Sequence, residues 1–411
     1  MAEPDRIVLI NDASVARGGA TGLAVLAAEL LCARGHAVAF LSGDGGDSPR
    51  LTGAGVSVAG LGQGRLLDRG RGVALATGLW NTAARRFLAD WIARHDTART
   101  VYHLHGWAQI LSPAVFAALA PVARRTIVHA HDFFLACPNG VYMDFPAQQP
   151  CKRVPMSTDC LATHCDKRSR AQKGWRVLRH GVMRRAFSAS DWAALAMIHP
   201  AMAEPLARGG VPAEKLVALR NPADIVPGPR IRAEANRKIV FVGRLSEEKG
   251  PVDLARACAA RALPVTFVGE GPCAAAIRAA NPTAEITGWQ DRAGVRRHLA
   301  QARALAMPSR LPEPFGLVAA EAARAGLPVI LPDFALMADE VETAGIGRSY
   351  DPLSPGGLEA ALDWIANRKE SDLKAMSERA HGDVARLALT PGEWADGLER
   401  LYRAALGQPN E

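Results

Sequence analysis

Two carboxylic acids, Glu313 and Glu321, stand on either side of a turn in the segment LPEPFGLVAAEAARAG. The turn contains Gly316, which has no side chain and therefore lets a ligand approach the backbone closely. A helix that starts there would point unpaired N–H groups and the positive end of its dipole outward, and both features suit a phosphate. The segment therefore predicts an anion-binding helix start with an acid on each side.

The separation of the two acids sets the size of the ligand between them. With ~1.5 Å of rise per helical residue, the carboxylates of Glu313 and Glu321 would flank a group about as large as a diphosphate. Each acid could then accept hydrogen bonds from hydroxyl groups on its own side of the phosphates, a layout that fits ribose, diphosphate and hexose. The alternative is that Glu313 is a solvated loop acid and Glu321 an ordinary surface residue of the helix.

A second set of candidate residues lies in the string VGRLSEEKG, which follows an apolar run. Gly243 would let this turn pass close to a ligand. Arg244 offers a planar fork of donors and Lys249 a compact charge, and both are suited to phosphate. Isolated basic residues are usually solvated, but this motif is long and its lysine precedes Glu313 by 64 residues. Glu270 follows the next apolar run in another glycine-rich loop, VGEGP.

Two expected strands, VYHLHGW and TIVHAHDFF, each carry two histidines that alternate along the strand. His103 and His105 would share one face of the first strand, and His129 and His131 one face of the second. A metal site made of all four histidines would require the strands to be neighbours in a register that the sequence does not give. Satisfied core histidines are the alternative for His103 and His129.

Four cysteines fall within 29 residues of a segment rich in proline and glycine: Cys137, Cys151, Cys160 and Cys165. Their spacings of 13, 8 and 4 intervening residues differ from the paired knuckles of common zinc ribbons. Four thiolates in one loop nevertheless suit tetrahedral Zn²⁺ or an iron–sulfur cluster in a structural role. Four independent thiols that pack a long insertion are the alternative.

Residues 166–187 predict a basic amphipathic helix. The residues expected on its apolar stripe are Trp175, Leu178, Val182, Met183 and Phe187. The basic residues on the other faces have two interpretations. They could form a solvent-exposed face of the helix, or they could lie against an anionic lipid surface.

The elements that would position these residues are predicted to form two doubly wound domains. Residues 6–43 have the pattern of a strand, a loop, a helix and a second strand, and residues 237–258 repeat the first three of these elements. Such units build parallel sheets with ligand loops at the carboxyl edge. The first loop contains Gly18 and Gly19, for which a plain tight turn is the alternative to ligand contact. The spacing is not G-x-G-x-x-G, so the nicotinamide fingerprint is absent.

The bulk numbers agree with two domains, since 411 residues exceed one ordinary core. Residues 1–225 carry 26 Lys+Arg and 17 Asp+Glu, a net charge of +9, whereas residues 226–411 carry 23 and 24, a net of −1. A nucleic acid, an anionic membrane or a phosphate-bearing acceptor would fit the basic half. The start of the chain lacks a signal-peptide pattern and no apolar run reaches a membrane span, so we expect a cytoplasmic protein.

The segment EPFGLVAAE and the string VGRLSEEKG together resemble two signatures of the retaining glycosyltransferases of family 4. The resemblance implies that Glu313 faces the donor sugar and that Glu321 binds the ribose. It assigns the distal phosphate to the backbone amides of Phe315, Gly316 and Leu317. It also implies that Arg244 and Lys249 neutralise the donor diphosphate, with Gly243 and Glu270 in the adjoining loops.

The same resemblance implies roles in the first domain and a GT-B fold. Gly18 and Gly19 would face the donor phosphates and the acceptor, and His131, next to Asp132, would contact the transferred sugar or the reacting centre. The implied domains are residues 1–222 on the acceptor side, with the Cys-rich loop 137–165, and residues 223–390 on the nucleotide-sugar side. A final helix, within 391–411, would pack back on the first domain.

Together with these residues, the resemblance implies a retaining hexosyltransferase that uses a nucleoside diphosphate sugar and a glycan or lipid-linked acceptor. No cofactor is expected for catalysis, because two cations can do the work of Mg²⁺. An anionic membrane surface could be met through 166–187, on the inner face of the membrane, whereas no nucleic-acid module is recognised. The rival functions are a nucleotide-sugar epimerase of the same fold and a nonenzymatic basic binder of membrane or nucleic acid.

Overall fold

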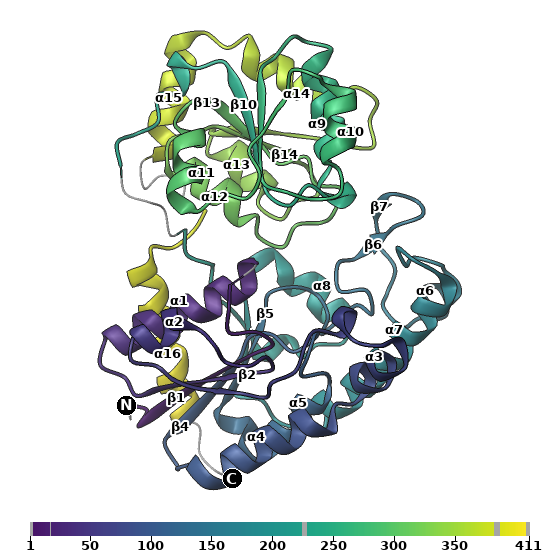
Figure 1. The fold of residues 1–411 in the computed structure, drawn as a ribbon, viewed down its shortest axis with the longest axis vertical. Helices are drawn as coiled ribbons and strands as arrows, with labels where there is room; N and C mark the ends of the chain where they lie inside the picture. Colours follow the sequence, from purple (N-terminus) through teal and green to yellow (C-terminus); the bar gives the residue numbers. More distant parts are fainter. Residues whose placement is uncertain (1–2, 17, 224–227, 382–386, 408–411) are drawn as a thin grey trace. The chain divides into compact units, whose positions relative to one another are not determined.

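The computed structural model describes residues 3–16, 18–223, 228–381 and 387–407, which fold into two compact units. Unit 1 consists of Met1–Pro146, Lys152–Asn221 and Pro391–Glu411, and unit 2 of Ala147–Cys151 and Pro222–Thr390. Each unit is built on one parallel sheet covered by helices (Figure 1). The last helix of the chain therefore belongs to the unit that contains the first strand.

The sheet of unit 1 has seven strands in the order β3-β2-β1-β4-β5-β8-β9. Their bounds are β1 Arg6–Asn11, β2 Val38–Ser42, β3 Ser57–Gly60, β4 Thr100–Leu104, β5 Thr126–Ala130, β8 Ala194–Met197 and β9 Leu216–Ala218. All neighbouring pairs run parallel. The apolar run of β1 is continuous rather than alternating because helices bury both faces, and Ile7, Val8, Leu9 and Ile10 are each 0% exposed.

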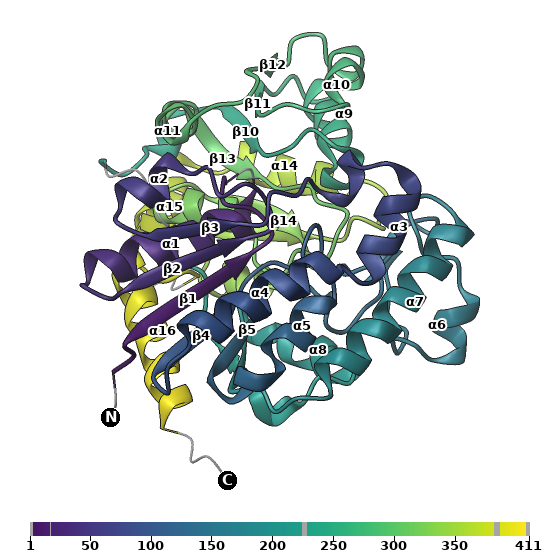
Figure 2. The same cartoon turned by 60° about the horizontal axis from the view of Figure 1, so that its bottom comes forward.

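The helices of unit 1 are α1 Gly19–Ala33, α2 Pro49–Gly53, α3 Arg71–Leu79, α4 Thr82–His95, α5 Ala114–Leu119, α6 Thr158–Ala162, α7 Arg170–Phe187, α8 Ala203–Arg208 and α16 Pro391–Leu406. Helix α16 contacts α1, β4 and β5 and lies along this sheet (Figure 2). Its inner side is formed by Trp394, Leu398 and Tyr402, which are fully buried. Leu401, beside Tyr402 in the sequence, is only half-buried.

The sheet of unit 2 has six strands in the order β12-β11-β10-β13-β14-β15. Their bounds are β10 Lys238–Val242, β11 Val265–Val268, β12 Glu285–Ile286, β13 Ala302–Ala306, β14 Val329–Pro332 and β15 Gly347–Tyr350. The helices are α9 Pro251–Ala259, α10 Ala274–Ala280, α11 Arg292–Leu299, α12 Leu317–Arg324, α13 Ala338–Thr343, α14 Gly357–Ala366 and α15 Glu370–His381. Two further strands, β6 Met143–Asp144 and β7 Gln149–Pro150, are two residues long.

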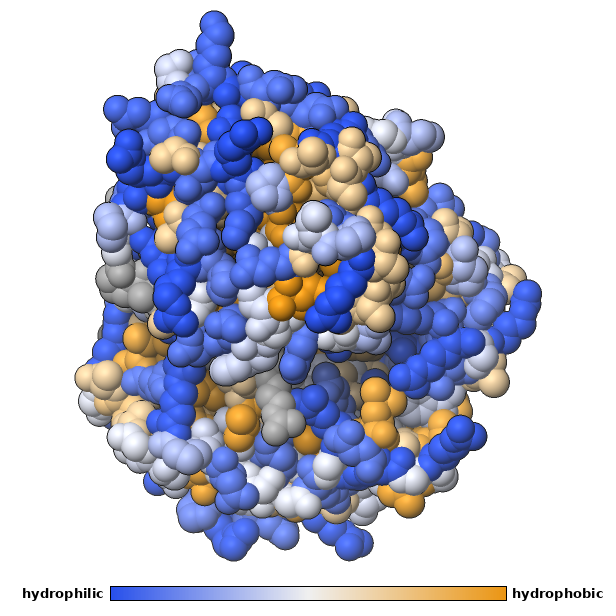
Figure 3. Space-filling view, turned by 45° about the horizontal axis from the view of Figure 1, so that its top comes forward, coloured by the Kyte–Doolittle hydropathy of each residue, from blue (hydrophilic) through white to orange (hydrophobic). Residues whose placement is uncertain are grey.

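None of the helices among the described residues combines the length and the hydropathy that a membrane-spanning helix needs. Figure 3 shows one face of the molecule, on which hydrophilic side chains predominate and hydrophobic ones form small scattered groups.

Candidate active site

The predicted donor-binding residues of unit 2 lie at the carboxyl ends of its central strands. After β10 the chain forms β11 and β12, which lie on one side of β10 in the strand order. It then forms β13, which pairs with β10 on the other side. The order of the strands therefore reverses between β10 and β13, and open parallel sheets bind ligands in the crevice at such a switch point. Lys249 follows β10, Glu270 follows β11 and Glu313 follows β13.

A pair of charged side chains connects the two loops at this switch point. The ammonium of Lys249 donates to Oε1 of Glu313, and the hydroxyl of Ser309 donates to the same oxygen at 2.6 Å. The Glu313 side chain is 13% exposed and that of Lys249 31%. Two residues 64 positions apart in the sequence are thus joined, and Glu313 is held by a cation and a hydroxyl rather than solvated in a loop.

Two glycines with positive φ shape the loops at this switch point. Gly250 has φ of +66°, and a Cβ there would lie 1.9 Å from the carbonyl oxygen of Pro308, so only glycine lets the turn after Lys249 pack on the loop after β13. Gly316 has φ of +73° and precedes the first residue of α12. The first N–H groups of a helix have no partner within it, so the backbone at Gly316 and Leu317 forms the predicted helix start.

The remaining predicted residues of unit 2 range from exposed to buried. Arg244 follows β10, its side chain is 71% exposed, and its guanidinium lies 3.8 Å from Glu248. Glu270 is exposed, while its carbonyl accepts a hydrogen bond from the amide of Leu245 at 2.9 Å, which ties the loops after β10 and β11 together at Gly243. Glu321 lies within α12 and is half-buried, and Phe315 is buried.

In unit 1 the glycine pair lies where the sequence predicts, at the carboxyl end of β1. Gly18 caps α1, a helix of 15 residues, and Gly19 is its first residue. Both glycines are exposed. The neighbouring Asp12 is buried and accepts hydrogen bonds from the amides of Gln109, Ile110 and Leu111 at 2.7 to 2.8 Å. Burial raises the pKa of Asp12 despite these three donors.

His131 lies just beyond the end of β5, and its Nε2 is 3.0 Å from Nδ1 of His105. Burial lowers the pKa of His131 to about 4, so the ring is neutral at physiological pH. Burial raises the pKa of the adjacent Asp132 to about 6, although its carboxylate accepts a hydrogen bond from the amide of Phe134. Strongly shifted pKa values of this kind are typical of functional sites.

The four histidines of β4 and β5 lie on one face because the two strands are parallel neighbours with Leu104 beside Val128. His103 bonds to the Tyr402 hydroxyl at 2.8 Å and to His129 at 3.1 Å. Burial lowers the pKa of both rings well below the ordinary value. One nitrogen from each of His103, His105 and His129 lies within 4.8 Å of the others. The rings of His103 and His129 are stacked, and the hydrogen bond of His103 to Tyr402 connects them to α16.

Helix α7 departs from the predicted pattern. The expected apolar stripe is buried at Met183 and Phe187, but Leu178 is 57% exposed. Two basic residues expected on the solvated faces, Lys173 and Arg179, are buried instead. The amphipathic prediction was therefore wrong for this half of the helix, because buried partners elsewhere in unit 1 satisfy the two charges.

Arg179 shows how a buried cation is satisfied. It donates to the carbonyls of Gly78 and Ala108 at 2.7 and 2.8 Å and lies over the rings of Trp107 and Trp175. Burial lowers its pKa to about 10, opposed by the negative charges of Asp12 and Asp132. The electrostatic interaction of Asp12 with Arg179 was not predicted, although an acid directly after the first strand is a signal that could have singled out Asp12.

The Cys-rich loop is centred on Lys173 rather than on a common point between thiols. Its ammonium lies 3.1 Å from the sulfur of Cys165 and 3.7 Å from that of Cys160. Cys137 contacts the Asn139 amide at 3.2 Å, and Cys151 is half-buried. A structural metal would have to displace the ammonium, so it stays a prediction that metal analysis before and after Cys151→Ser would test.

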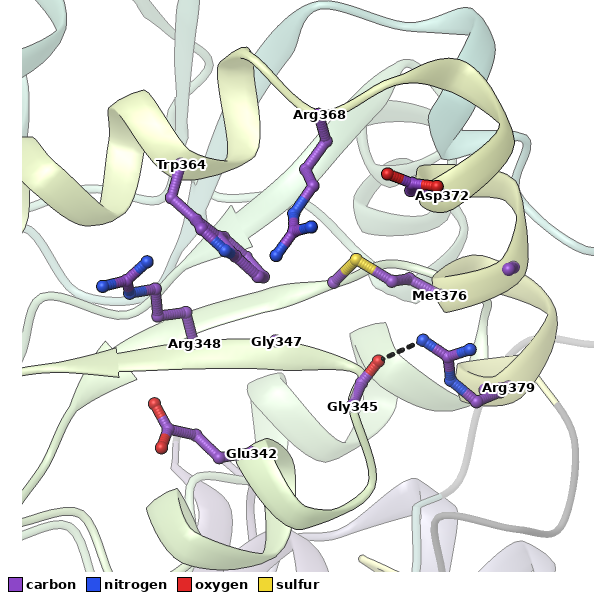
Figure 4. Close-up of a pocket in the computed structure, with 10 residues that line it drawn as sticks. Glu342, Gly345, Gly347, Arg348, Trp364, Arg368, Asp372, Met376 and Arg379 are labelled. Carbon is purple, nitrogen blue, oxygen red and sulfur yellow. Dashed lines mark hydrogen bonds between the residues drawn. The ribbon is translucent and has the colours of Figure 1, made fainter.

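A separate hollow of about 710 Å³ lies on unit 2 beside β15, and none of the predicted site residues lines it (Figure 4). Trp364 lies between two guanidinium groups, those of Arg348 at 5.6 Å and Arg368 at 4.5 Å from the ring centre. Arg379 donates to the carbonyl of Gly345 at 2.8 Å. These arginines already have partners, so the candidate site stays at the strand ends.

Comparisons with known proteins agree with this geometry. Residues 229–382 match the model of the glycosyl transferases group 1. Glycogen synthase of Mycobacterium tuberculosis (strain CDC 1551 / Oshkosh) is 28% identical over 312 residues, which is 69% of each chain. The match does not divide group 1 further, so family 4 stays a prediction.

Solved structures show the same architecture over nearly the whole chain. Sucrose-phosphate synthase of Thermosynechococcus elongatus has a TM-score of 0.70 at 17% identity, covering 97% of this chain and 98% of its own. HepE of Anabaena in complex with UDP has a TM-score of 0.65 at 14% identity, covering 96% and 98%. These likenesses confirm the predicted GT-B fold. The match to the glycosyl transferases of group 1 thus covers residues 229–382, within unit 2, whereas the likeness of fold covers nearly the whole chain.

Proposed function

We propose that the protein is a retaining glycosyltransferase that moves a sugar from a nucleoside diphosphate to a glycan or lipid-linked acceptor. The proposed setting is the synthesis of a cell-surface polysaccharide or glycolipid. The observation that carries the donor class is the Lys249–Glu313 pair beside the start of α12, at the switch point of unit 2. The likeness to HepE, whose structures contain UDP and UDP-glucose, supports the same class.

Departure of the sugar leaves negative charge on the diphosphate. Lys249, the solvent-reaching Arg244 and the amides at the start of α12 are proposed to stabilise that charge, which is usually the largest contribution to catalysis. Lys249 pairs with Glu313 in this structure, so a diphosphate would compete with that carboxylate for the ammonium. These cations could perform the role that Mg²⁺ plays in other transferases.

The two acids are proposed to bind hydroxyl groups at opposite ends of the donor. Lys249 and Ser309 both contact Oε1 of Glu313, which makes Oε2 the atom proposed to accept from a sugar hydroxyl. Glu321, within α12, is proposed to bind the ribose. Each role uses the carboxylate as a hydrogen-bond acceptor, so replacement by the isosteric amide tests it.

The proposed stereochemistry is retention by a route in which leaving group and acceptor share one face of the sugar. No carboxylate is assigned as a nucleophile. His131 is proposed to contact the transferred sugar as a neutral ring, because its pKa of about 4 excludes a positive charge at neutral pH. It could therefore accept or donate one hydrogen bond without repelling the positive character at the anomeric carbon.

A thermal-shift panel of UDP-, GDP- and ADP-sugars tests the donor class. We expect one nucleotide to stabilise the wild type and that shift to be lost in Glu321→Ala and in Arg244→Ala. Arg256→Ala is a matched control, since this arginine is 69% exposed on the next helix, α9. If no nucleotide sugar stabilises the wild type, the donor assignment is wrong; an inverted anomer, seen by NMR of the product, would refute retention alone.

A further inference from the structure

Exposed apolar side chains gather on three neighbouring elements of unit 1. They belong to a short 3₁₀ turn, Leu66–Asp68, to α3 with its C-cap, and to α7. The helix α3 contacts both the turn and α7, and Figures 1 and 2 both show α3 beside α7. We call this surface the α3 face and define it by Leu67, Val73, Leu75, Trp80 and Leu178, which are 36% to 74% exposed.

The α3 face is held firmly, so its exposure is not that of a loose segment. Trp175 donates to the carbonyl of Leu75 at 3.2 Å, and Arg179 donates to that of Gly78 at 2.7 Å. A Cβ on Gly78 would lie 2.7 Å from the Trp175 ring, so α3 packs on α7 through its glycine. Gly78 is the buried residue of α3, and the apolar side chains of the helix consequently face outward.

An ordinary surface helix buries its apolar side chains, whereas Val73 and Leu75 of α3 are exposed together with its charged residue. Its sequence RGVALATGL contains one charged residue, Arg71. Clustered exposed apolar side chains of this kind mark interaction sites rather than solvated surface.

The charges around the α3 face are mainly positive, although Asp68, next to Leu67, is exposed and acidic. Residues 167–187 contain eight Lys and Arg and no Asp or Glu. Arg71, Arg168, Arg170 and Arg185 are exposed and make no ion pair within the described residues. An apolar surface bordered by unpaired arginines complements an anionic lipid bilayer, in which apolar side chains enter the headgroup region and arginines meet the phosphates.

We propose that the α3 face docks unit 1 on an anionic membrane. The contact is made by α3 and the exposed edge of α7, not by the whole basic helix 166–187, because Lys173 and Arg179 point into unit 1. Docking itself does not require transferase activity. Its purpose, to bring unit 1 to a lipid-linked acceptor, rests on the proposed function.

Vesicle flotation of the full-length protein tests the docking. We expect flotation with vesicles of phosphatidylcholine and phosphatidylglycerol at low salt, and little with phosphatidylcholine alone or at high salt. The variant Leu67→Ser, Val73→Ser, Leu75→Ser should lose about tenfold in vesicle binding. Arg71→Gln and Arg170→Gln should each lose roughly fivefold.

The matched control is Trp289→Ser with Leu353→Ser, which removes two apolar residues of unit 2 that are 72% and 54% exposed. This variant should float like the wild type. No flotation of the wild type, or equal flotation of the serine variant of the α3 face, would overturn the proposal. A wild-type dimer that the same serine variant dissociates, without vesicle binding, would instead show that the face pairs with a second copy.

The nucleotide-sugar thermal shift, measured on the same samples, separates the two proposals. A serine variant that no longer floats but keeps its donor shift supports docking independently of donor binding. Flotation of a wild type that shows no donor shift leaves the docking standing and refutes the donor assignment.

Discussion

The Lys249–Glu313 pair allows a prediction in which two neighbouring variants behave differently. Lys249→Met removes the cation proposed to hold the diphosphate, and Glu313→Gln removes the carboxylate that competes for it. A hydrogen bond to a charged group contributes about 1.5–3 kcal/mol, which corresponds to roughly 10- to 150-fold in affinity. We therefore expect Lys249→Met to weaken the nucleoside diphosphate and the nucleotide sugar alike by that factor.

Glu313→Gln should separate the two ligands. The Lys249 ammonium, no longer paired with a carboxylate, would bind the nucleoside diphosphate at least as tightly as in the wild type. The rate of transfer should fall at least about tenfold, because the sugar loses a charged acceptor. The fold should tolerate Glu313→Gln, because Ser309 still reaches residue 313. Lys249→Met leaves the largely buried Glu313 carboxylate without its cation, so some loss of stability is expected in that variant.

Isothermal titration with the nucleoside diphosphate and with the intact donor measures both effects, and thermal unfolding checks the fold. Lys238→Met is the matched control, because Lys238 forms a comparable pair with Glu285 at 3.1 Å on the same sheet and is not assigned to the site. Unchanged affinity of Lys249→Met for the nucleoside diphosphate would refute the reasoning. So would a loss in Glu313→Gln as large as that in Lys249→Met.

Three further predictions concern stability. Gly250→Ala should lower the melting temperature more than Gly288→Ala. Both glycines have positive φ, but only at Gly250 would the Cβ meet a carbonyl oxygen. Equal shifts in melting temperature would show that the close approach at Gly250 does not affect stability. Arg179→Met should lower the free energy of unfolding, measured in urea, by about 3 kcal/mol. Arg185→Met, on the exposed side of α7, should leave this free energy almost unchanged. Acidification from pH 7 to pH 5 should destabilise unit 1, because the pKa of His131 is about 4 when folded against an ordinary 6.5 and the unfolded chain therefore binds more protons in that window. Asp132, whose folded pKa is about 6 against 3.8, and Asp12, whose pKa burial also raises, oppose this change. They stand against the four buried histidines of β4 and β5, whose pKa values burial lowers, so a melting temperature that rises on acidification would contradict the argument.

The sequence could predict the elements and their order because each depends on local patterns. Gly316 heads a helix as expected, since a left-handed residue is needed where the loop enters α12. The apolar run of β1 similarly predicted a strand. Such features need only neighbouring residues for their explanation, and they were sufficient to indicate the fold that the comparisons confirm.

The sequence could not predict contacts between distant segments. The periodicity of α7 assigns Arg179 to a solvated face, but Trp107, Asp12 and the carbonyl of Gly78, all remote in sequence, create a buried place for it. The stacking of the histidines required the register of β4 on β5, which alternation within one strand does not contain. Ser309 is close to Glu313 in the sequence, but its hydroxyl reaches the carboxylate because of the conformation of the loop after β13, which the sequence pattern does not specify.

The position of α16 has a consequence for synthesis and truncation of the protein. Trp394, Leu398 and Tyr402 complete the hydrophobic core of unit 1. The core of unit 1 therefore stays incomplete until the ribosome has synthesised all of unit 2. During this interval the surfaces of β4 and β5 that α16 covers are open to chaperones or to misassembly. A truncation after residue 390 would accordingly damage the unit that lies first in the sequence, although the cut falls beside the second.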